Sequence, residues 1–314
     1  MWLKTFASKL LRNFAENRRR VISDWRILIA ARRIAHGENA PLPDERKAAE
    51  IRRELVSRGD IKPVKGIEGV FIIEVPFAHL LEVSEEQLIQ EANPWAVFGF
   101  ATALLHHGLT DLPPKEVYTI QFKDGEHLYR MPLGTTLDDW ADLQLPPAKH
   151  PQKIGETVVV WTEIQRKLEF GIMVGYSSGL PVYVTDVERT LLDALRMPDK
   201  CGGIAKVLHA WRDAESMDVA RMVEYTDHFD IQNLRQRVGY VLERLGRSHP
   251  TLEKWRHRLK RGGSIKLVAS EPYSEIVVVT AFSTCSRSVP SVATNSPPTS
   301  AATAAPVAGS NRAT

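Results

Sequence analysis

Residues 179–204 read GLPVYVTDVERTLLDALRMPDKCGGI, and this stretch decides the fold of the second half of the chain. Its PVYV segment alternates β-branched and aromatic residues, as a short strand does, and leads directly into a helix. Thr185 and Glu188 have the T-x-x-E spacing of a capping box, which predicts that Thr185 caps this helix. The MP pair ends the helix, and Gly202 and Gly203 permit a sharp reversal into the next one.

The run VTDVERTLLDALRMPDKCGG resembles the signature of AbiEi-type proteins, the antitoxin and autoregulator half of type IV abortive-infection toxin-antitoxin operons. Two upstream segments match in the expected order, NPWAVFGFATALLHHGLTD at 93–111 and PKEVYTI at 114–120. Together with a winged-helix-like N-terminus, the resemblance covers roughly residues 20–265. The signature positions, which we interpret as structural, are Thr185, Asp186, Glu188, Arg189, Thr190, Asp193, Gly202 and Gly203.

The resemblance implies a repressor of its own promoter that also counteracts a nucleotidyltransferase-like toxin. In the family, neutralisation need not proceed through a stable complex. The partners expected from it are double-stranded operator DNA, shared by a homodimer over inverted half-sites, and the cognate toxin. We predict no catalytic residue, no metal and no cofactor, because the sequence has neither a phosphate-binding loop nor a nucleophile elbow, and we expect the protein in the bacterial cytoplasm.

Length and charge indicate two domains and a tail. We expect a winged-helix DNA-binding domain at 1–78, an α+β antitoxin domain at 79–270 and a disordered tail at 271–314. Residues 1–65 hold 16 Lys and Arg against 8 Asp and Glu, whereas the remainder is mildly acidic. This asymmetry favours nucleic acid as the partner of the N-terminal domain, although a solvated basic surface would have the same composition.

Cysteine usage and hydropathy favour a reducing, non-membrane setting. Cys201 and Cys285 are too far apart in sequence to indicate a disulfide framework or a zinc site. The longest nearly uninterrupted apolar run is far shorter than the ~20 residues that span a bilayer. The basic, amphipathic N-terminus leaves a membrane-surface role open as an alternative.

Three helices and a hairpin are predicted at the N-terminus. The helices cover 4–16, 25–35 and, after the cap Asp44, a third up to residue 58. The third helix should bury Ala48, Ile51 and Leu55. A glycine-containing hairpin over 61–75 follows, and this is the element order of a winged helix-turn-helix, whose third helix enters the major groove.

The opposite face of the third helix supplies the DNA-binding candidates. Arginine forks suit guanine edges, which makes Arg46 and Arg53 the candidates for base contacts. The candidates for phosphate contacts are Lys47, Arg58, Lys62 and Lys65. Glu50 lies four residues after Arg46 and three before Arg53, so intrahelical ion pairs are the alternative reading of this face.

The body is predicted to be a mixed sheet followed by helices. Asn93 and Pro94 mark the start of a buried helix over 95–107. Strands are expected at 117–122, 127–131, 157–161, 171–176 and 181–184, with a short helix or turn at 136–143. Helices are expected at 204–212, 219–225, 231–245 and 252–260, the last three capped by Asp218, Asp230 and Thr251.

Two site chemistries remain as alternatives. Adjacent His106 and His107 could ligate a metal, but neighbouring residues on a helix diverge, and a helix C-terminus accounts for them more simply. Cys201 could have a lowered pKa near a helix N-terminus, although a small packing residue is the simpler reading.

Two competing functions remain as well. A metal-dependent nucleic-acid enzyme using Asp186, Glu188 and Asp193 would need acidic partners from other elements, which the sequence does not supply. A stand-alone winged-helix regulator with a ligand-sensing or dimerising C-terminal domain would differ from an antitoxin in having no toxin gene beside it.

The end of the chain differs from the resembled family, whose members typically finish on a strand pair. Of residues 281–314, 24 of 34 are Ala, Ser, Thr or Pro, so this segment has little apolar surface to bury and we expect it to be disordered. We interpret 276–314 as an altered C-terminus.

Overall fold

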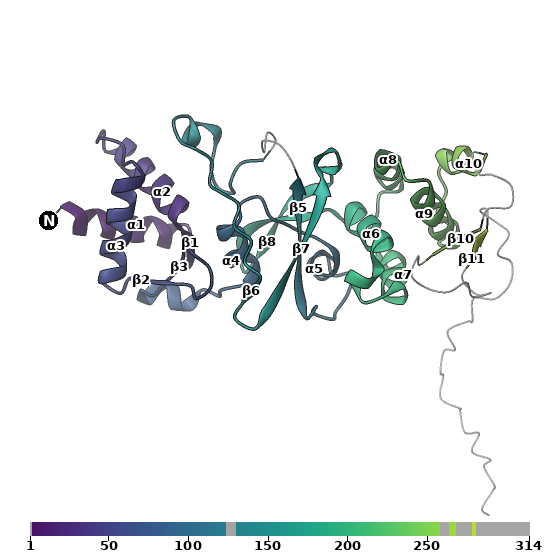
Figure 1. Cartoon of the computed structure of the whole chain (residues 1–314), viewed down its shortest axis with the longest axis horizontal. Coiled ribbons are helices and arrows are strands. Elements are labelled where there is room, and N and C mark those ends of the chain that lie inside the picture. The colour runs from purple at the N-terminus through teal and green to yellow at the C-terminus, as the bar shows by residue number, and fades with distance from the viewer. Residues whose placement is uncertain (1, 124–129, 258–263, 268–277, 281–314) are drawn as a thin grey trace, which may run out of the picture.

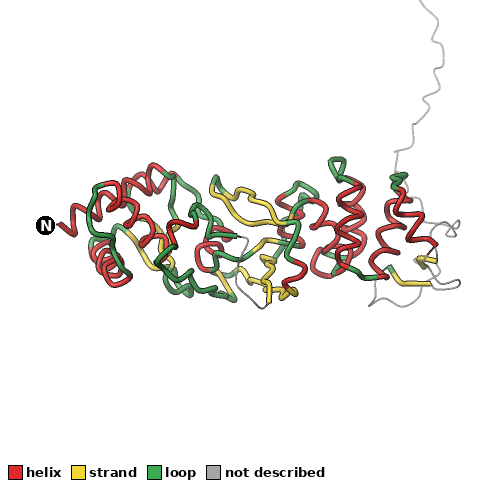
Figure 2. The backbone as a smooth tube through the Cα atoms, turned by 90° about the horizontal axis from the view of Figure 1, so that it is seen from above, coloured by secondary structure: helices red, strands yellow, loops and turns green. Residues whose placement is uncertain are grey.

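The computed structural model describes residues 2–123, 130–257, 264–267 and 278–280. The fold is mixed α+β, as the sequence predicts, and three parts follow one another along the long axis (Figures 1 and 2). Three helices occupy the N-terminal end, a six-stranded sheet lies in the middle, and a group of helices forms the other end. None of the helices in the described ranges is both long and apolar enough to cross a lipid bilayer.

The N-terminal part combines three helices with a small sheet. Its elements are α1 (Trp2–Glu16), β1 (Val21–Ser23), α2 (Asp24–Gly37), α3 (Glu45–Ser57), β2 (Ile61–Pro63) and β3 (Val70–Ile73). The strand order is β1-β3-β2, and both pairings are antiparallel. The three helices and the hairpin were predicted. Strand β1 was not, because three buried residues carry no detectable periodicity.

Local sequence explains where α3 lies and which face it buries. The Asp44 carboxylate accepts a hydrogen bond from the Lys47 amide at 2.7 Å and so caps the helix, as predicted. Ala48, Ile51 and Leu55 are buried together with side chains of α1 and α2 in one hydrophobic core. This packing fixes the opposite face of α3 toward solvent.

The middle part is built on the larger sheet. Its elements are η1 (Pro76–Leu80), α4 (Glu85–Ala92), β4 (Val97–Phe98), α5 (Phe100–His106), β5 (Glu116–Lys123), η2 (Leu137–Trp140), β6 (Lys153–Ile154), β7 (Thr157–Gln165), η3 (Arg166–Leu168), β8 (Ile172–Ser177) and β9 (Leu180–Thr185). The strand order is β6-β7-β5-β4-β9-β8. The pairs β5–β7 and β4–β9 are parallel, and the other neighbours are antiparallel.

The helix predicted over 95–107 is wrong in its first half. Val97 and Phe98 form β4 between β5 and β9, and α5 begins only at Phe100. Phe100 has a φ of 52°, so the backbone changes direction sharply between strand and helix. Asn93 does not cap a helix, because its side chain accepts a hydrogen bond from the Trp95 amide in a turn. An all-apolar run does not distinguish a buried strand from a buried helix.

The strand predicted at 127–131 can be compared with the structure only at its last two residues. Residues 124–129 lie outside the described part of the chain, and Arg130 and Met131 are not in a strand. The Arg130 guanidinium instead forms an ion pair with Glu169 at 2.9 Å and lies 4.9 Å from the centroid of the Tyr183 ring. The Arg130 side chain therefore anchors the loop before η2 to the sheet.

Helices dominate the C-terminal part. Its elements are α6 (Val187–Arg196), η4 (Pro198–Cys201), α7 (Ile204–Asp213), α8 (Val219–Phe229), α9 (Gln232–Arg244), α10 (Pro250–His257), β10 (Ser264–Lys266) and β11 (Val278–Thr280). All four helices predicted after the signature are present. Asp218 caps α8 as predicted. The other two caps are wrong, because Asp230 ends α8 with a φ of 51° and Thr251 lies inside α10.

The expected disordered tail contains one short strand. Val278–Thr280 pairs antiparallel with Ser264–Lys266, although it falls within the segment expected to be disordered. The rest of 271–314 lies outside the described residues, so the disorder expected there remains a prediction.

A hydrophobic core crosses the boundary expected near residue 78. Val21, Ile67 and Val70 of the N-terminal part pack in one cluster with side chains of α4 and of the large sheet, among them Ile89 and Val159. The N-terminal part is therefore joined to the middle part by buried apolar contacts rather than by a free linker.

Candidate nucleic-acid interface

The solvent face of α3 presents two arginines. Arg46 and Arg53 are both exposed and lie seven residues apart, which places them on the same side of the helix about two turns from each other. Within the described residues, neither forms an ion pair with a carboxylate. The Arg53 Nε group donates only to the Ala49 carbonyl, at 3.3 Å. We call this side of α3 the arginine face.

The acidic residue on this face pairs with lysine rather than with arginine. The Lys47 ammonium lies 2.7 Å from the Glu50 carboxylate, and this hydrogen bond, reinforced by Arg46 and Arg53, lowers the pKa of Glu50. The ion pair expected as an alternative for Arg46 and Arg53 thus forms with Lys47. Lys47 is accordingly a weaker candidate for a phosphate contact than the two arginines.

A groove separates α3 from the β2–β3 hairpin. It has a volume of about 760 Å³, and Arg53 and Val56 line one side while Val64 and Gly66 line the other. The turn requires Gly66, whose φ is 83°. Lys62 on β2 and Lys65 in the turn are exposed on the hairpin. Helix α3 and the hairpin that directly follows it therefore face each other across one groove, which Arg53 lines, while Lys62 and Lys65 are exposed elsewhere on the hairpin.

Two other basic residues of this region have structural partners. Arg58, a predicted phosphate contact, pairs with Asp60 at 2.7 Å and donates to the Lys4 carbonyl at 3.2 Å, which ties the end of α3 to α1. Arg52, which lines the same groove as Arg53, pairs with Asp24 at 2.8 Å. Asp60 is a sequence neighbour of Arg58, whereas Asp24 lies 28 residues from Arg52, so the local sequence gives no sign of the second pair.

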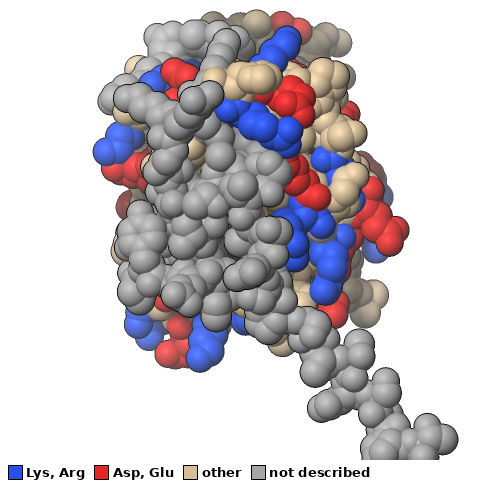
Figure 3. Space-filling model, turned by 90° about the vertical axis from the view of Figure 1, so that its right-hand side faces the viewer, with Lys and Arg blue, Asp and Glu red and all other residues tan. Residues whose placement is uncertain are grey.

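The opposite end of the molecule has a mixed surface. In the view of Figure 3, basic and acidic side chains alternate over the part that is described. Arg212 pairs with Asp213, and Arg256 pairs with Glu243 and Glu253. This pairing contrasts with the arginine face, where the two arginines lack a carboxylate partner among the described residues.

The signature positions begin with a helix cap, but not the predicted one. Asp186, rather than Thr185, caps α6, and its Oδ1 accepts the Arg189 amide at 2.8 Å. Its Oδ2 accepts the Tyr225 hydroxyl at 2.8 Å. Tyr225 lies 39 residues further along the chain, so no local pattern predicts this contact.

Thr185 has a different role from the one predicted. Its hydroxyl is within 2.7 Å of the Thr190 hydroxyl, and Thr190 also donates to the Thr185 carbonyl at 3.2 Å. Both side chains are buried. They fasten the end of β9 to the first turn of α6.

Glu188 is not part of a capping box either. Its carboxylate is buried, accepts the Asp218 amide at 2.7 Å and lies 3.6 Å from the Arg221 guanidinium. It connects α6 to the start of α8. The T-x-x-E spacing was misleading because a tertiary partner takes the carboxylate that the spacing assigns to the local helix end.

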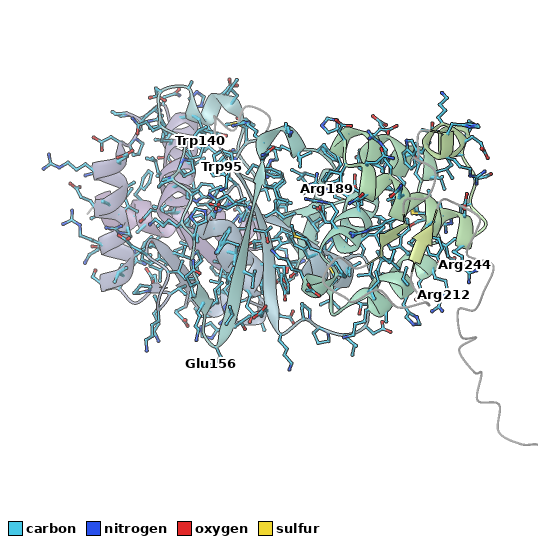
Figure 4. All side chains as sticks on the ribbon, turned by 45° about the vertical axis from the view of Figure 1, so that its right-hand side comes forward. Trp95, Trp140, Glu156, Arg189, Arg212 and Arg244 are labelled. Atoms are coloured by element: carbon cyan, nitrogen blue, oxygen red, sulfur yellow. The ribbon has the colours of Figure 1, made fainter. Side chains whose placement is uncertain are left out.

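Arg189 and Asp193 form a fully enclosed ion pair. Both side chains are 0% exposed, and the Arg189 Nε lies 2.7 Å from the Asp193 carboxylate. The guanidinium also donates to the Leu168 carbonyl at 2.7 Å and lies over the adjacent rings of Phe170 and Phe229, at 4.4 and 4.8 Å from their centroids. Figure 4 shows Arg189 among the C-terminal helices, away from the N-terminal end.

The remaining signature positions shape the turn after α6. Gly202 and Gly203 have φ values of 76° and 96°, as the predicted reversal requires. Burial raises the pKa of the adjacent Cys201 thiol to about 12. Cys201 is therefore a packing residue and not an activated thiol. Cys285 lies outside the described residues.

The adjacent histidines hold the sheet and α5 together. The His107 Nε2 is 2.6 Å from the Thr185 carbonyl. His106 packs on Gly175, where a Cβ atom would come within 2.4 Å of its ring, and burial lowers the pKa of His106. Among the residues that the structure describes, no three His, Cys, Asp or Glu side chains are grouped as a metal site requires.

The comparisons with known proteins identify no family. No family model matches the chain, and no curated protein matches it. Among solved structures, the chain is similar to the crystal structure of RV2827C protein from Mycobacterium tuberculosis, at 15% sequence identity and a TM-score of 0.40. The match covers 81% of this chain and 80% of that one. At this TM-score the similarity carries no argument about function.

Proposed function

We propose that this protein is a DNA-binding autorepressor and antitoxin of a type IV toxin-antitoxin operon, acting in the bacterial cytoplasm. Its N-terminal part binds operator DNA as a winged helix, with two protomers on inverted half-sites. Its body counteracts a nucleotidyltransferase-like toxin. The observation that carries the DNA-binding half is the arginine face of α3, with its two exposed arginines beside a groove and a basic hairpin.

The order and pairing of the N-terminal elements support a winged helix. Three helices precede the β2–β3 hairpin, and β1 adds a third strand on the β3 side. In winged helices the third helix enters the major groove and the hairpin contacts the backbone or the minor groove. Arg46 and Arg53 then read base edges, while Lys62 and Lys65 neutralise phosphates.

The antitoxin half rests on the resemblance of the signature positions to AbiEi-type proteins. The side chains of Thr185, Glu188, Arg189 and Asp193 are buried, where they hold the sheet and the C-terminal helices together. Their role in neutralisation is then to build the body, and surface residues outside the signature act on the toxin. No catalytic residue, metal or cofactor is part of the proposal.

DNA binding is tested by fluorescence anisotropy with DNA from upstream of the gene and with shuffled DNA, over a salt series. The wild type is compared with the double variant Arg46→Ala, Arg53→Ala. We expect preference for the upstream DNA, and a loss of about 1–3 kcal/mol for each base contact removed. Lys62→Ala and Lys65→Ala should weaken binding to both DNAs equally and reduce the salt dependence.

A matched control variant removes two positive charges from the other end of the molecule. Arg212 and Arg244 are exposed at the far end of the molecule (Figure 4), so the double variant Arg212→Ala, Arg244→Ala should bind DNA like the wild type. If both double variants lose affinity equally, binding reflects net charge and the arginine face is not the interface. If the wild type does not distinguish the two DNAs, the repressor role is wrong.

Neutralisation is tested by co-expression with the nucleotidyltransferase-like protein whose gene we expect beside this one. Growth should be restored by the wild type and by the Arg46→Ala, Arg53→Ala variant, because the body carries this activity. Absence of such a gene, or of any rescue, would leave a stand-alone regulator as the function.

A further inference from the structure

A cavity lies behind α3, at the junction between the N-terminal part and the middle part. It has a volume of about 350 Å³, within the range of small-molecule sites. α2 and α3 form one wall, and the loop after η2 forms the other. Figure 4 shows Trp140, which ends η2, beside the N-terminal helices. We call this space the junction cavity.

Two indoles give the junction cavity an aromatic wall. The ring centroids of Trp25 and Trp140 are 6.1 Å apart, with their planes at 46°. The Trp25 Nε1 donates to the Glu91 carbonyl at 3.0 Å, and the Trp140 Nε1 donates to the Thr135 hydroxyl at 2.8 Å. Because both N–H groups are already bonded, the rings are held in place and offer a ligand mainly apolar surface.

Charges of both signs meet at one point of the cavity rim. A Cβ atom on Gly69 would lie 2.6 Å from the Asp24 carboxylate and 3.0 Å from the Lys149 ammonium. Asp24 also pairs with Arg52 at 2.8 Å, and the Lys149 ammonium donates to the Glu68 carbonyl at 2.9 Å. Because position 69 is a glycine, with a φ of 74°, the Asp24 carboxylate and the Lys149 ammonium can both lie against its backbone.

The lining selects the charge of the ligand. A purely anionic ligand is disfavoured by the carboxylates of Asp24 and Glu45, and a purely cationic ligand by Arg52 and Lys149. Glu91 also lines the cavity, but Arg26, Arg19 and Ser23 already bind its carboxylate. A zwitterion places its ammonium by Asp24 and its carboxylate by Arg52 and Lys149.

We propose that the junction cavity binds a free aromatic α-amino acid. The aromatic ring of the ligand lies against Trp25 and Trp140. Its ammonium pairs with Asp24 and its carboxylate pairs with Arg52 and Lys149, in place of the Asp24–Arg52 ion pair. Arg52 precedes Arg53 directly on α3, so a ligand that takes Arg52 from Asp24 acts on the helix that carries the arginine face. Binding therefore changes DNA affinity, and this second statement rests on the proposed DNA-binding function.

Isothermal titration calorimetry on the full chain without DNA tests the site. The ligands are L-tryptophan, L-tyrosine and L-phenylalanine, together with tryptamine, which lacks the carboxylate, and indole-3-acetate, which lacks the ammonium. We expect at least one amino acid to bind at a ratio of one to one, and both single-charge probes to bind at least about tenfold more weakly than L-tryptophan. If no amino acid binds at about 1 mM, the junction cavity is not an amino-acid site. If tryptamine or indole-3-acetate binds as tightly as L-tryptophan, the ligand is not a zwitterion.

Three variants locate the site. Ala49→Phe fills the cavity from α3 and should abolish binding, and Arg52→Gln should weaken it at least about tenfold. Arg53→Gln, the adjacent residue on the arginine face, is the matched control and should bind the amino acid like the wild type. Unchanged binding to Ala49→Phe, with wild-type circular dichroism and unfolding midpoint, would place the ligand elsewhere.

Anisotropy separates the ligand site from the DNA-binding function. A saturating amino acid should shift the affinity of the wild type for upstream DNA at least about fivefold, and should leave that of Arg52→Gln unchanged. Binding of the amino acid with no shift would overturn the coupling to α3. A chain that binds the amino acid but no DNA would refute the proposed function while retaining the site.

Discussion

Arg189 illustrates how a charged residue is accommodated in a protein interior by several partners. Its guanidinium is fully enclosed, with Asp193 at 2.7 Å, carbonyl acceptors and two aromatic rings around it. Removing water from a charge costs several kcal/mol unless a partner compensates it. Arg189 therefore depends on Asp193 for its carboxylate, whereas Asp193 also pairs with Arg196 at 2.7 Å.

The two residues should be strongly coupled in unfolding. Asp193→Leu should lower the free energy of unfolding by about 3–5 kcal/mol, because it leaves the enclosed Arg189 guanidinium without a carboxylate. Arg189→Leu should cost less, because Asp193 keeps its ion pair with Arg196 at 2.7 Å. The double variant should lose much less than the sum. Urea denaturation of the four proteins measures this, and single costs that add to within about 0.5 kcal/mol would show that the pair is not coupled.

Asp139 predicts a pH dependence at the residue scale. A hydrogen bond from Arg33 lowers the pKa of Asp139 to about 2, from an ordinary value of about 4. Because the unfolded chain takes up this proton at the higher pH, the contribution to stability is complete above about pH 4 and is lost as the pH falls toward 2.

Comparison with Asp139→Asn tests this dependence. The variant should be less stable than the wild type at pH 6, and the difference in free energy of unfolding should shrink as the pH is lowered below about 4. Urea denaturation at several pH values between 6 and 3 measures it. A difference that stays constant over this range would exclude the Arg33–Asp139 interaction as its source.

At the scale of elements, helix α6 depends on a cap supplied by Asp186 and a hydroxyl supplied by α8. Asp186→Ala should lower the free energy of unfolding by about 0.5–2 kcal/mol through the cap and by about 0.5–1.5 kcal/mol through the Tyr225 hydrogen bond. Asp186→Asn retains an acceptor for the Arg189 amide, so it should lose less, and Tyr225→Phe should lose only the second part. Equal losses for Asp186→Ala and Asp186→Asn would mean that the cap contributes little.

At the scale of the whole molecule, the buried Glu91 carboxylate joins the N-terminal part to α4. It lies 2.6 Å from Arg26 and 3.2 Å from Arg19, and burial lowers the pKa of Arg19 to about 10. Together with the hydrophobic core that crosses the same boundary, this network joins the two parts through buried polar and apolar contacts.

Glu91→Ala should reveal this dependence. The variant leaves two buried arginines without their carboxylate, so we expect a loss of about 3–5 kcal/mol in the free energy of unfolding. Glu68→Ala is the matched control at the same junction, because the Glu68 side chain is 94% exposed, and it should change stability by less than about 0.5 kcal/mol. A similar small effect for both variants would show that the parts are held together by apolar contacts alone. Thermal and urea unfolding measure both.

The sequence by itself determined most of the helices, the glycine turns and the α+β class, because these depend on neighbouring residues. The cap Asp44, the buried side of α3 and the reversal at Gly202 are all encoded within a few positions. The exposed positions of Arg46 and Arg53 follow from the same helical period.

Only the tertiary structure decided what depends on residues far apart in the chain. Val97 and Phe98 became a strand because β5 and β9 offer hydrogen-bond partners on both sides. Glu188 left the capping box because Asp218 and Arg221 lie beside it in the fold. The junction cavity likewise brings α2, α3 and a loop more than 90 residues later together. Local spacing determines which contacts a residue is able to form. Which of them forms depends on burial in the folded protein, because an unpaired buried polar group costs more free energy than a local hydrogen bond contributes.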